Sequence, residues 1–224
     1  MKSIYQDNAN KWNHVYATVS NIPWEYDKVD ANIEQWFLNQ SLIGKNVLDV
    51  GCGQTAAEAI WLAKQGLDVT AIDVSNKAIE KANEFIKKEN SSLKLATVDI
   101  FENNFLENSF DFVVDKCCFH LFDYSASLRY EFAKNVSKIL KPNGMWISIS
   151  GVTPNSMPTD FLNKLSEIEL ELHPHEISLP DISTAIEPYM KIVSINSVTM
   201  KIYKNIDWPA WMVVSKKEKV GFNF

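Results

Sequence analysis

Short runs of β-branched and apolar residues alternate along most of this chain with longer stretches whose apolar residues recur every three to four positions. The short runs predict β-strands, and the longer stretches predict amphipathic helices. Strands are expected at 46–49, 67–73, 93–98, 110–115, 145–149, 192–203 and 211–215. Strands separated by helices at this spacing predict right-handed crossovers, and therefore a mostly parallel sheet with helices on both faces.

Helical periodicity is clearest in two segments between the strands. Apolar residues at positions 78, 79, 82, 85 and 86 follow Ser75, which is the predicted N-cap. A second helix is predicted to end at a turn formed by residues 141–144, Lys-Pro-Asn-Gly. Further helices are expected at 7–19, 27–40, 159–172 and 181–189.

Composition places the chain among ordinary globular proteins. Of its 224 residues 46% are hydrophobic and 22% are charged, with 7 glycines and 8 prolines, which excludes collagen-like and disordered classes. No internal repeat or low-complexity tract interrupts the pattern. We therefore expect a single domain spanning residues 1–224.

Charge and cysteine content limit the partners and the compartment. The net charge is −6 and Arg129 is the single arginine, whereas proteins that hold nucleic acid depend on arginine and on clustered basic residues. Cys52, Cys117 and Cys118 cannot all pair, and adjacent cysteines are poor zinc ligands. With no visible secretory signal and no apolar run of about 20 residues, we expect a reduced, cytoplasmic protein without a nucleic-acid partner, membrane span or metal site.

A glycine-rich loop follows the first predicted strand. The sequence VLDVGCGQT places Gly51 and Gly53 between that strand and the next helix, where backbone N–H groups are free to meet a ligand. With Ala56 the loop satisfies the dinucleotide pattern G-x-G-x-x-A, and Asp73 follows about 20 residues later. The loop alone therefore leaves a nicotinamide dehydrogenase open.

Acidic residues end four of the predicted strands, at Asp49, Asp73, Asp99 and Asp115. An acid about 4 Å from a phosphate costs roughly 1 to 4 kcal/mol, so Asp49, just before the loop, disfavours a pyrophosphate. The same acids suit a cationic nucleoside with ribose hydroxyls and an exocyclic amine. S-adenosylmethionine fits that description.

Five segments, taken together, resemble the class I S-adenosylmethionine-dependent methyltransferases over about residues 40–215. The order and spacing of VLDVGCGQT, TAIDVS, TVDI, FDFVVDKCCFHLF and LKPNGMWISIS match the motifs of that family. Thr55 is a departure, because many members have a third glycine there. The resemblance implies an α/β, Rossmann-like, seven-stranded sheet whose last strand is antiparallel, with the final hairpin at 203–211.

The resemblance also implies an organisation and a set of roles. Residues 1–45 would form an N-terminal helical lid, 46–150 the cofactor-binding core, and 151–224 a substrate-side insertion with the last strands. Asp49 would contact the methionine ammonium of the cofactor, Asp73 the ribose and Asp99 the adenine amine. The further cofactor-binding residues would be Gly51, Cys52, Gly53, Val74, Ile100, Asp115, Trp12 and Tyr16.

The expected acceptor is a small molecule. KWNHVYATVSNIPWEY and DKCCFHLF resemble the thiopurine and thiol methyltransferase branch, with Cys117 in place of a glycine. A thiol is favoured because its pKa near 8.5 needs no strong base. The substrate-binding candidates are Trp24, Lys116, Cys117, Phe119 and His120, and the catalytic candidates are Asp115 and His120, although His120 also suits a purely structural role.

Three alternatives remain open at this point. A related D-K-G pattern occurs in protein lysine methyltransferases, which makes a protein acceptor the second hypothesis. The third is a catalytically silent module that binds S-adenosylmethionine, and the fourth is the nicotinamide dehydrogenase. The product of the favoured reaction would be S-adenosylhomocysteine, and a monomer is compatible with the sequence.

Overall fold

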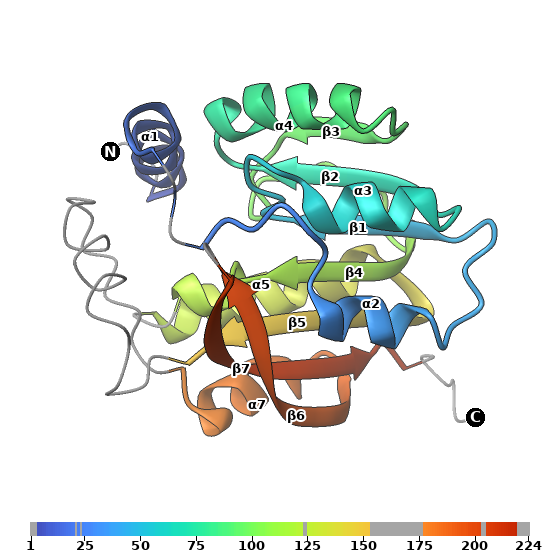
Figure 1. Ribbon diagram of the computed structural model, residues 1–224. Helices are drawn as coiled ribbons and strands as arrows, with labels where there is room; N and C mark the ends of the chain where they lie inside the picture. Colours follow the sequence, from blue (N-terminus) through green and yellow to red (C-terminus); the bar gives the residue numbers. More distant parts are fainter. Residues whose placement is uncertain are drawn as a thin grey trace, which may run out of the picture.

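The sheet that the sequence predicts is present in the computed structural model, which describes residues 4–20, 22, 24–122, 125–152, 177–202 and 205–218. Its seven strands lie in the order β3-β2-β1-β4-β5-β7-β6 (Figure 1). Their bounds are β1 Asn46–Val50, β2 Asp68–Asp73, β3 Lys94–Thr97, β4 Phe110–Lys116, β5 Leu140–Gly151, β6 Lys191–Ile202 and β7 Ile206–Lys216. Strand β7 runs antiparallel to both of its neighbours, and the strands from β3 to β5 are mutually parallel. The Rossmann-like fold with an antiparallel last strand is confirmed.

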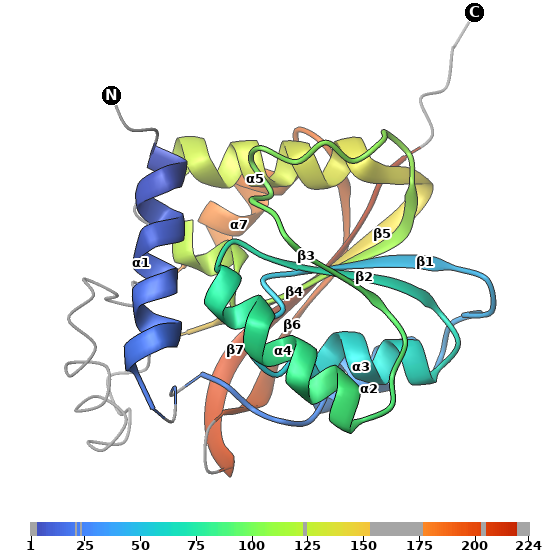
Figure 2. The same ribbon diagram turned by 90° about the horizontal axis from the view of Figure 1, so that it is seen from above.

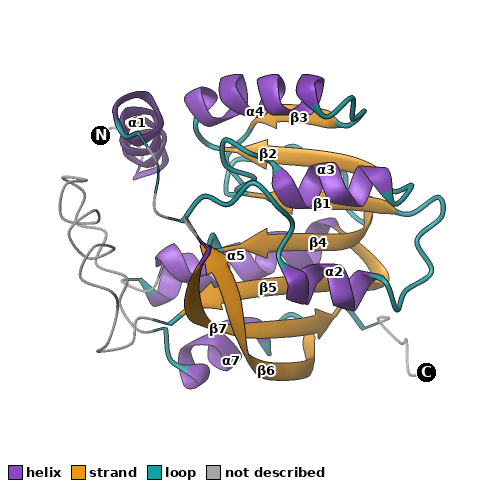
Figure 3. Ribbon diagram, in the orientation of Figure 1, coloured by secondary structure: helices purple, strands orange, loops and turns teal. Residues whose placement is uncertain are grey.

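Helices cover both faces of this sheet (Figure 3). Their bounds are α1 Ile4–Thr18, α2 Ala31–Phe37, α3 Ala57–Lys64, α4 Asn76–Lys88, α5 Ala126–Ile139 and α7 Leu179–Ile186, with a short 3₁₀ helix η1 at Phe119–Phe122. Seen from above, α2, α3 and α4 lie on one face and α5 and α7 on the other (Figure 2). Helix α1 stands across the edge at which the parallel strands end.

Alternation along the strands divides the core into two layers. Val47 and Val114 belong to the cluster that packs against α2 and α3, while Leu48 and Val113 belong to the cluster beneath α5 and α7. Because successive strand residues point to opposite faces, strands that are apolar on both faces are buried between two helical layers. In the described part of the chain, no helix is long and apolar enough to cross a bilayer.

Side chains cap two helix starts, one of which the sequence predicts. The Ser75 side chain accepts a hydrogen bond from Ala78 N, as the sequence predicts for α4. The helix expected at 27–40 begins later, at Ala31, because Asp30 has an extended backbone and its side chain accepts from Asn32 N. Residues 24–30 are therefore not helical. We call them the strap.

Two expected boundaries are wrong. Residues 141–144 do not stand between a helix and a strand, because Leu140 already pairs with Phe110 in β5 and the four residues form an irregularity before Met145 pairs with Phe112. Strand β7 begins at Ile206, five residues before the prediction, and includes Pro209. The expected helix 159–172 and Tyr203 of the expected hairpin lie outside the described residues.

Candidate functional site

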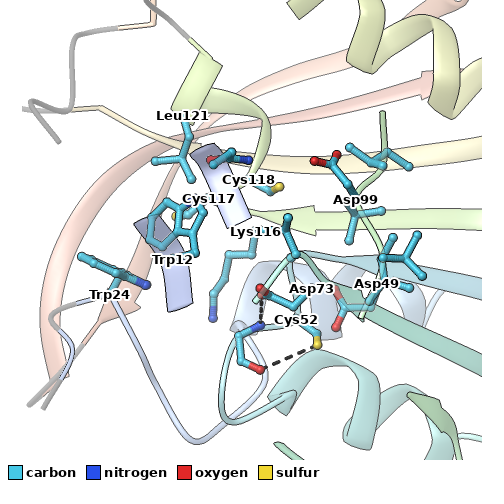
Figure 4. A pocket seen from close by; sticks show the side chains of 18 of the residues that line it. Trp12, Trp24, Asp49, Cys52, Asp73, Asp99, Lys116, Cys117, Cys118 and Leu121 are labelled. Carbon is cyan, nitrogen blue, oxygen red and sulfur yellow. Dashed lines mark hydrogen bonds between the residues drawn. The ribbon is translucent and has the colours of Figure 1, made fainter. Parts of the chain in front are cut away.

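A pocket opens at the carboxyl ends of β1, β2 and β4, beneath α1 and the strap (Figure 4). Of the residues that the sequence singles out, those that line it are Trp12, Tyr16, Trp24, Asp49, Gly51, Cys52, Gly53, Asp73, Val74, Asp99, Ile100, Lys116 and Cys117. Carboxyl ends of parallel strands form the usual ligand crevice of such sheets. The structure therefore brings most of the predicted site residues together.

The glycine loop forms one wall of this pocket. Gly51 and Gly53 both have left-handed backbones, with φ of +72° and +63°, which glycine adopts at little cost. A Cβ on Gly51 would lie 3.0 Å from Cys118 Sγ, and a Cβ on Gly53 would lie 2.4 Å from a carboxylate oxygen of Glu25. The two glycines are therefore required both by conformation and by the close approach of other side chains.

Asp73 joins the end of β2 to this loop. Its carboxylate accepts hydrogen bonds from Gly53 N at 3.1 Å and Ser75 N at 2.8 Å. Burial outweighs these bonds and raises the pKa of Asp73 to about 6. Each carboxylate oxygen has a second lone pair, so this side chain remains able to accept ligand hydroxyls.

Asp49 and Asp99 each hold a buried oxygen without a hydrogen-bond partner in the described part of the chain. Among the described residues, nothing donates a hydrogen bond to Oδ2 of either carboxylate. Burial is the main cause that raises the pKa of both groups. Since buried polar atoms are normally satisfied, these two oxygens fit a ligand that carries N–H donors, such as an ammonium and an exocyclic amine.

Glu25 of the strap is a site residue that the sequence did not reveal. Its Oε1 accepts from Tyr16 Oη at 3.0 Å and from Gln54 N at 3.1 Å, and its Oε2 accepts from Thr55 Oγ1 at 3.1 Å. Burial raises its pKa, and the hydrogen bonds from Gln54, Tyr16 and Thr55 act in the opposite direction. The one signal available was an acid directly after the aromatic segment that ends in Trp24.

Lys116 at the end of β4 forms a buried ion pair with a second unforeseen acid. Its Nζ lies 2.7 Å from Glu58 Oε1, and the two side chains are only 12% and 7% exposed. The same Glu58 oxygen accepts Asp30 N, which ties the strap to α3. The attraction of Glu58 raises the pKa of Lys116 despite burial, so the ammonium stays charged. Glu58 stands alone as an acid in the otherwise apolar first turn of α3, a signal that was visible in the sequence.

Cys117 has the backbone of a glycine. Its φ is +62°, a left-handed conformation that costs a residue with a Cβ about 1–2 kcal/mol. Its Sγ lies 3.6 Å from Met200 Sδ, and burial raises the pKa of the thiol to about 12. The thiol is therefore protonated, and its side chain lines the pocket at the position where the family that the sequence resembles has a glycine.

Asp115 lies elsewhere than predicted. It is fully buried and does not line the pocket, because its carboxylate accepts Cys118 N, Phe119 N and Trp146 Nε1 at 3.3, 2.9 and 2.8 Å. These bonds cap η1 and fix the end of β4. The expected cofactor and catalytic roles of Asp115 are not supported by this placement.

Phe119 and His120 also stand apart from the pocket lining. Phe119 is fully buried against Trp146, with ring centroids 5.2 Å apart. His120 accepts Gly151 N at Nδ1, at 2.8 Å, and burial lowers its pKa to about 4. A lone pair that already accepts a backbone N–H is not available for a substrate proton, so the structural role of His120 is the one its geometry supports.

The pocket as a whole has opposite characters on its two sides. Asp49, Asp73 and Asp99 lie on one side, and Trp12 and Trp24 lie on the other (Figure 4). The two indole rings meet edge to face with centroids 5.7 Å apart. Acids on one wall and aromatic faces on the other both attract a cation. No group of three or more metal-ligating side chains suited to a metal ion occurs in the described ranges.

Comparisons with known proteins agree with this geometry. Residues 48–148 match the family model described as a methyltransferase domain. A ubiquinone biosynthesis O-methyltransferase of Rickettsia akari is 34% identical over 111 residues, which are 49% of this chain and 41% of that protein. The chain thus aligns with less than half of the length of this curated relative.

Two solved structures share the fold over nearly the whole chain. One, from work on the conversion of a disulfide bond into a thioacetal group during echinomycin biosynthesis, has a TM-score of 0.80 at 20% identity and covers 96% of this chain and 94% of its own. An N-methyltransferase of Haemonchus contortus bound to S-adenosylhomocysteine has a TM-score of 0.64 at 17% identity, covering 96% of this chain and 59% of its own. Residues 48–148 therefore resemble a methyltransferase domain, within a fold that the two solved structures share.

Proposed function

We propose that this protein transfers the methyl group of S-adenosylmethionine to a small molecule, with a thiol as the favoured acceptor. The observation that carries the proposal is the pair of buried carboxylate oxygens, on Asp49 and Asp99, that no described residue binds, in a pocket whose wall is acidic. S-adenosylmethionine has a donor for each oxygen, in its ammonium and its adenine amine. A dinucleotide, in contrast, would bring a negatively charged phosphate next to the carboxylate of Asp49, which would repel it.

The chain's own residues bind and orient the cofactor. Asp73 would hold the ribose, Val74 and Ile100 would flank the adenine, and the loop from Gly51 to Gly53 would meet the amino-acid portion. Bound S-adenosylmethionine supplies a methyl group on a positively charged sulfur that a nucleophile can displace. Trp12 and Tyr16 of α1 line the pocket, and Tyr16 donates to Glu25, which also accepts Gln54 N of the loop. We propose that residues 1–45 form a lid that keeps water out of the pocket, within a single domain.

Acceptor chemistry depends on which proton-accepting groups remain for a substrate. Of the acids that line the pocket, Asp49, Asp73 and Asp99 are assigned to the cofactor, Glu25 is bound by Tyr16 and the loop, and Glu58 is paired with Lys116. His120 has its Nδ1 engaged by Gly151, and Cys117 is a protonated thiol. An alcohol acceptor needs a general base, whereas a thiol with a pKa near 8.5 is about 3% ionised at pH 7 without one. Trp24, Cys117 and Leu121 line the pocket with apolar and polarisable surface. These features support a soft, apolar acceptor.

A methyl-transfer assay tests the proposal. The purified protein is incubated with S-adenosylmethionine that carries tritium in its methyl group. Separate reactions contain small aromatic thiols, catechols or a cell lysate as the acceptor. We expect label in the organic extract of the thiol reactions. Label confined to catechol extracts would overturn the thiol preference, label confined to protein bands would indicate a protein methyltransferase, and no transfer to any acceptor would indicate a silent binding module.

Two variants on β2 make this assay specific to the pocket. Asp73→Ala removes the carboxylate that faces the ligand, and Asp68→Ala removes an acid at the other end of the same strand, whose side chain is 57% exposed and pairs with Lys94. Transfer should fall in the first variant and persist in the second. Equal activities would show that the labelled product does not arise in this pocket.

A further inference from the structure

Two successive N–H groups of the glycine loop are already bound by carboxylates of the protein. Gly53 N donates to Asp73 Oδ2 at 3.1 Å, and Gln54 N donates to Glu25 Oε1 at 3.1 Å. In nucleotide-binding proteins the N–H groups of such loops bind a phosphate. Here Glu25, which comes from the strap and lies 28 or more residues away in sequence, takes up that anion position.

Glu25 is held in this position from three directions. Tyr16 Oη donates to it from α1, Gln54 N from the loop, and Thr55 Oγ1 from the residue after. Thr55 Oγ1 lies equally far, 3.1 Å, from the backbone oxygen of Tyr26, so its single hydroxyl proton is shared between two adjacent residues of the strap. Gly53 leaves the space for the carboxylate, since a Cβ there would overlap it at 2.4 Å.

One acceptor position of this carboxylate is still open. Oε1 accepts two hydrogen bonds, whereas Oε2 accepts one in the described structure, and Glu25 lines the pocket. Asp73, which accepts the N–H of Gly53, adds a second negative charge at the loop. A ligand group that approaches the loop between them must therefore be a hydrogen-bond donor and is favoured when it is cationic.

We propose that Glu25 determines which ligands the glycine loop accepts, by binding the ammonium of an amino-acid tail and excluding a phosphate. The inference rests on the proposed function, because it assigns a recognition residue within the same cofactor site. Asp49, which lies in the strand before the loop, would accept another N–H of the same ammonium, which carries three donors. Glu25 is a specificity residue supplied by the N-terminal segment. Its carboxylate explains why a loop with a dinucleotide-like sequence pattern binds a different class of ligand.

Calorimetric titration of Glu25→Gln tests this role. The variant keeps an oxygen acceptor and the side-chain length while it removes the charge, and Asp27→Asn is the matched control, since Asp27 is an exposed acid of the same strap. We expect Glu25→Gln to weaken S-adenosylmethionine and S-adenosylhomocysteine by the same factor, about tenfold or more, from the loss of one charge-assisted hydrogen bond. Adenosine, which has no amino-acid tail, should change by less than about twofold.

ADP supplies the complementary measurement. Removing the charge of Glu25 should strengthen binding of ADP, because its phosphates meet one repulsive carboxylate fewer. Equal losses for adenosine and S-adenosylmethionine would show that Glu25 only supports the shape of the loop and would overturn the inference, as would unchanged affinities for all ligands. If the unaltered protein binds no S-adenosylmethionine, the proposed function fails as well. Circular dichroism and thermal unfolding of both variants show whether the fold is intact.

Discussion

The backbone N–H of Gly151 donates a hydrogen bond to Nδ1 of His120 at 2.8 Å, and His120 is only 7% exposed. This bond joins η1 to the end of β5. It requires the neutral tautomer with its proton on Nε2, because a protonated Nδ1 cannot accept. His120 therefore supports the chain segment beside the pocket and does not take up substrate protons.

Replacing His120 distinguishes a structural role from that of a general base. Asn places a carbonyl oxygen near the position of Nδ1, so His120→Asn should keep the bond and retain activity, whereas loss of a general base costs about 10²–10⁴-fold. His120→Leu leaves the Gly151 N–H buried without an acceptor and should lower the free energy of unfolding by about 1–3 kcal/mol. Urea denaturation and initial rates check both. A hundredfold loss of rate in a stable His120→Asn protein would restore the catalytic role.

Asp73 and Asp115 should differ sharply when each is replaced by alanine. Asp73→Ala removes the acceptor of the ribose hydroxyls, and the loss of bonds worth about 1.5–3 kcal/mol each should weaken S-adenosylmethionine by at least about tenfold. Asp115→Ala leaves three buried donors without their acceptor and should mainly lower stability, by about 3 kcal/mol or more.

Calorimetry and urea denaturation on the same preparations distinguish the two effects. Asp115→Asn is the control, because its amide oxygen still accepts the N–H groups of η1. If the stable Asp115→Asn protein lost as much cofactor affinity as Asp73→Ala, Asp115 would belong to the cofactor site after all.

Stability should depend on pH in a direction set by the buried carboxylates. The pKa of both Asp73 and Asp115 is about 6 in the folded chain, against 3.8 ordinarily. Between these values the folded chain holds a proton that the unfolded chain has lost, so stability falls as the pH rises, by on the order of 3 kcal/mol for each group. His120 has the opposite effect and offsets about one of these carboxylates. Burial lowers its pKa from 6.5 to about 4, so its contribution to the free energy of unfolding grows as the pH rises from 4 to 6.5.

Urea denaturation at several pH values between 5 and 7 measures the sum of these opposing contributions to the free energy of unfolding. The free energy of unfolding should decrease from pH 5 to pH 7 in the unaltered protein, and more steeply in His120→Asn, which lacks the opposing titration. A free energy that increases over this window in both proteins would contradict the assignment of raised pKa values to the carboxylates.

Cys117→Gly should be tolerated. Glycine adopts the φ of +62° without strain, and that gain offsets the entropy that glycine loses on folding and the lost contact with Met200. We expect the free energy of unfolding to change by less than about 1 kcal/mol, whereas the β-branched Cys117→Val should lose about 2 kcal/mol or more. The glycine variant should also accept bulkier thiols. A larger loss in the free energy of unfolding for Cys117→Gly than for Cys117→Val would show that the contact of the thiol with Met200 outweighs the backbone strain at residue 117.

The sheet and the strand-end acids could be predicted because they depend on local spacing. Asp49, Asp73 and Asp99 lie within two residues of the ends of β1, β2 and β3, and parallel strands bring their ends to one edge. Gly51 and Gly53 were recognisable for the same reason. These residues form the acidic wall of the pocket that the structure shows.

The residues that were missed or misplaced depend on contacts distant in sequence, or on the direction of one side chain. Glu25 reaches the loop only because Asp30 ends the strap and Gly53 leaves room for its carboxylate. Asp115 follows the strand-end rule, yet its carboxylate turns to the N–H groups of Cys118 and Phe119 three and four residues later. That spacing is typical of a cap, and it was the one local warning in the sequence.

Titration of the unaltered protein with S-adenosylmethionine and with NAD, in the same calorimeter and buffer, tests the central claim most directly. The acidic wall and the carboxylate of Glu25 in the anion position of the loop predict saturable binding of S-adenosylmethionine at one site per chain and no measurable binding of NAD. Binding of NAD without binding of S-adenosylmethionine would contradict the account.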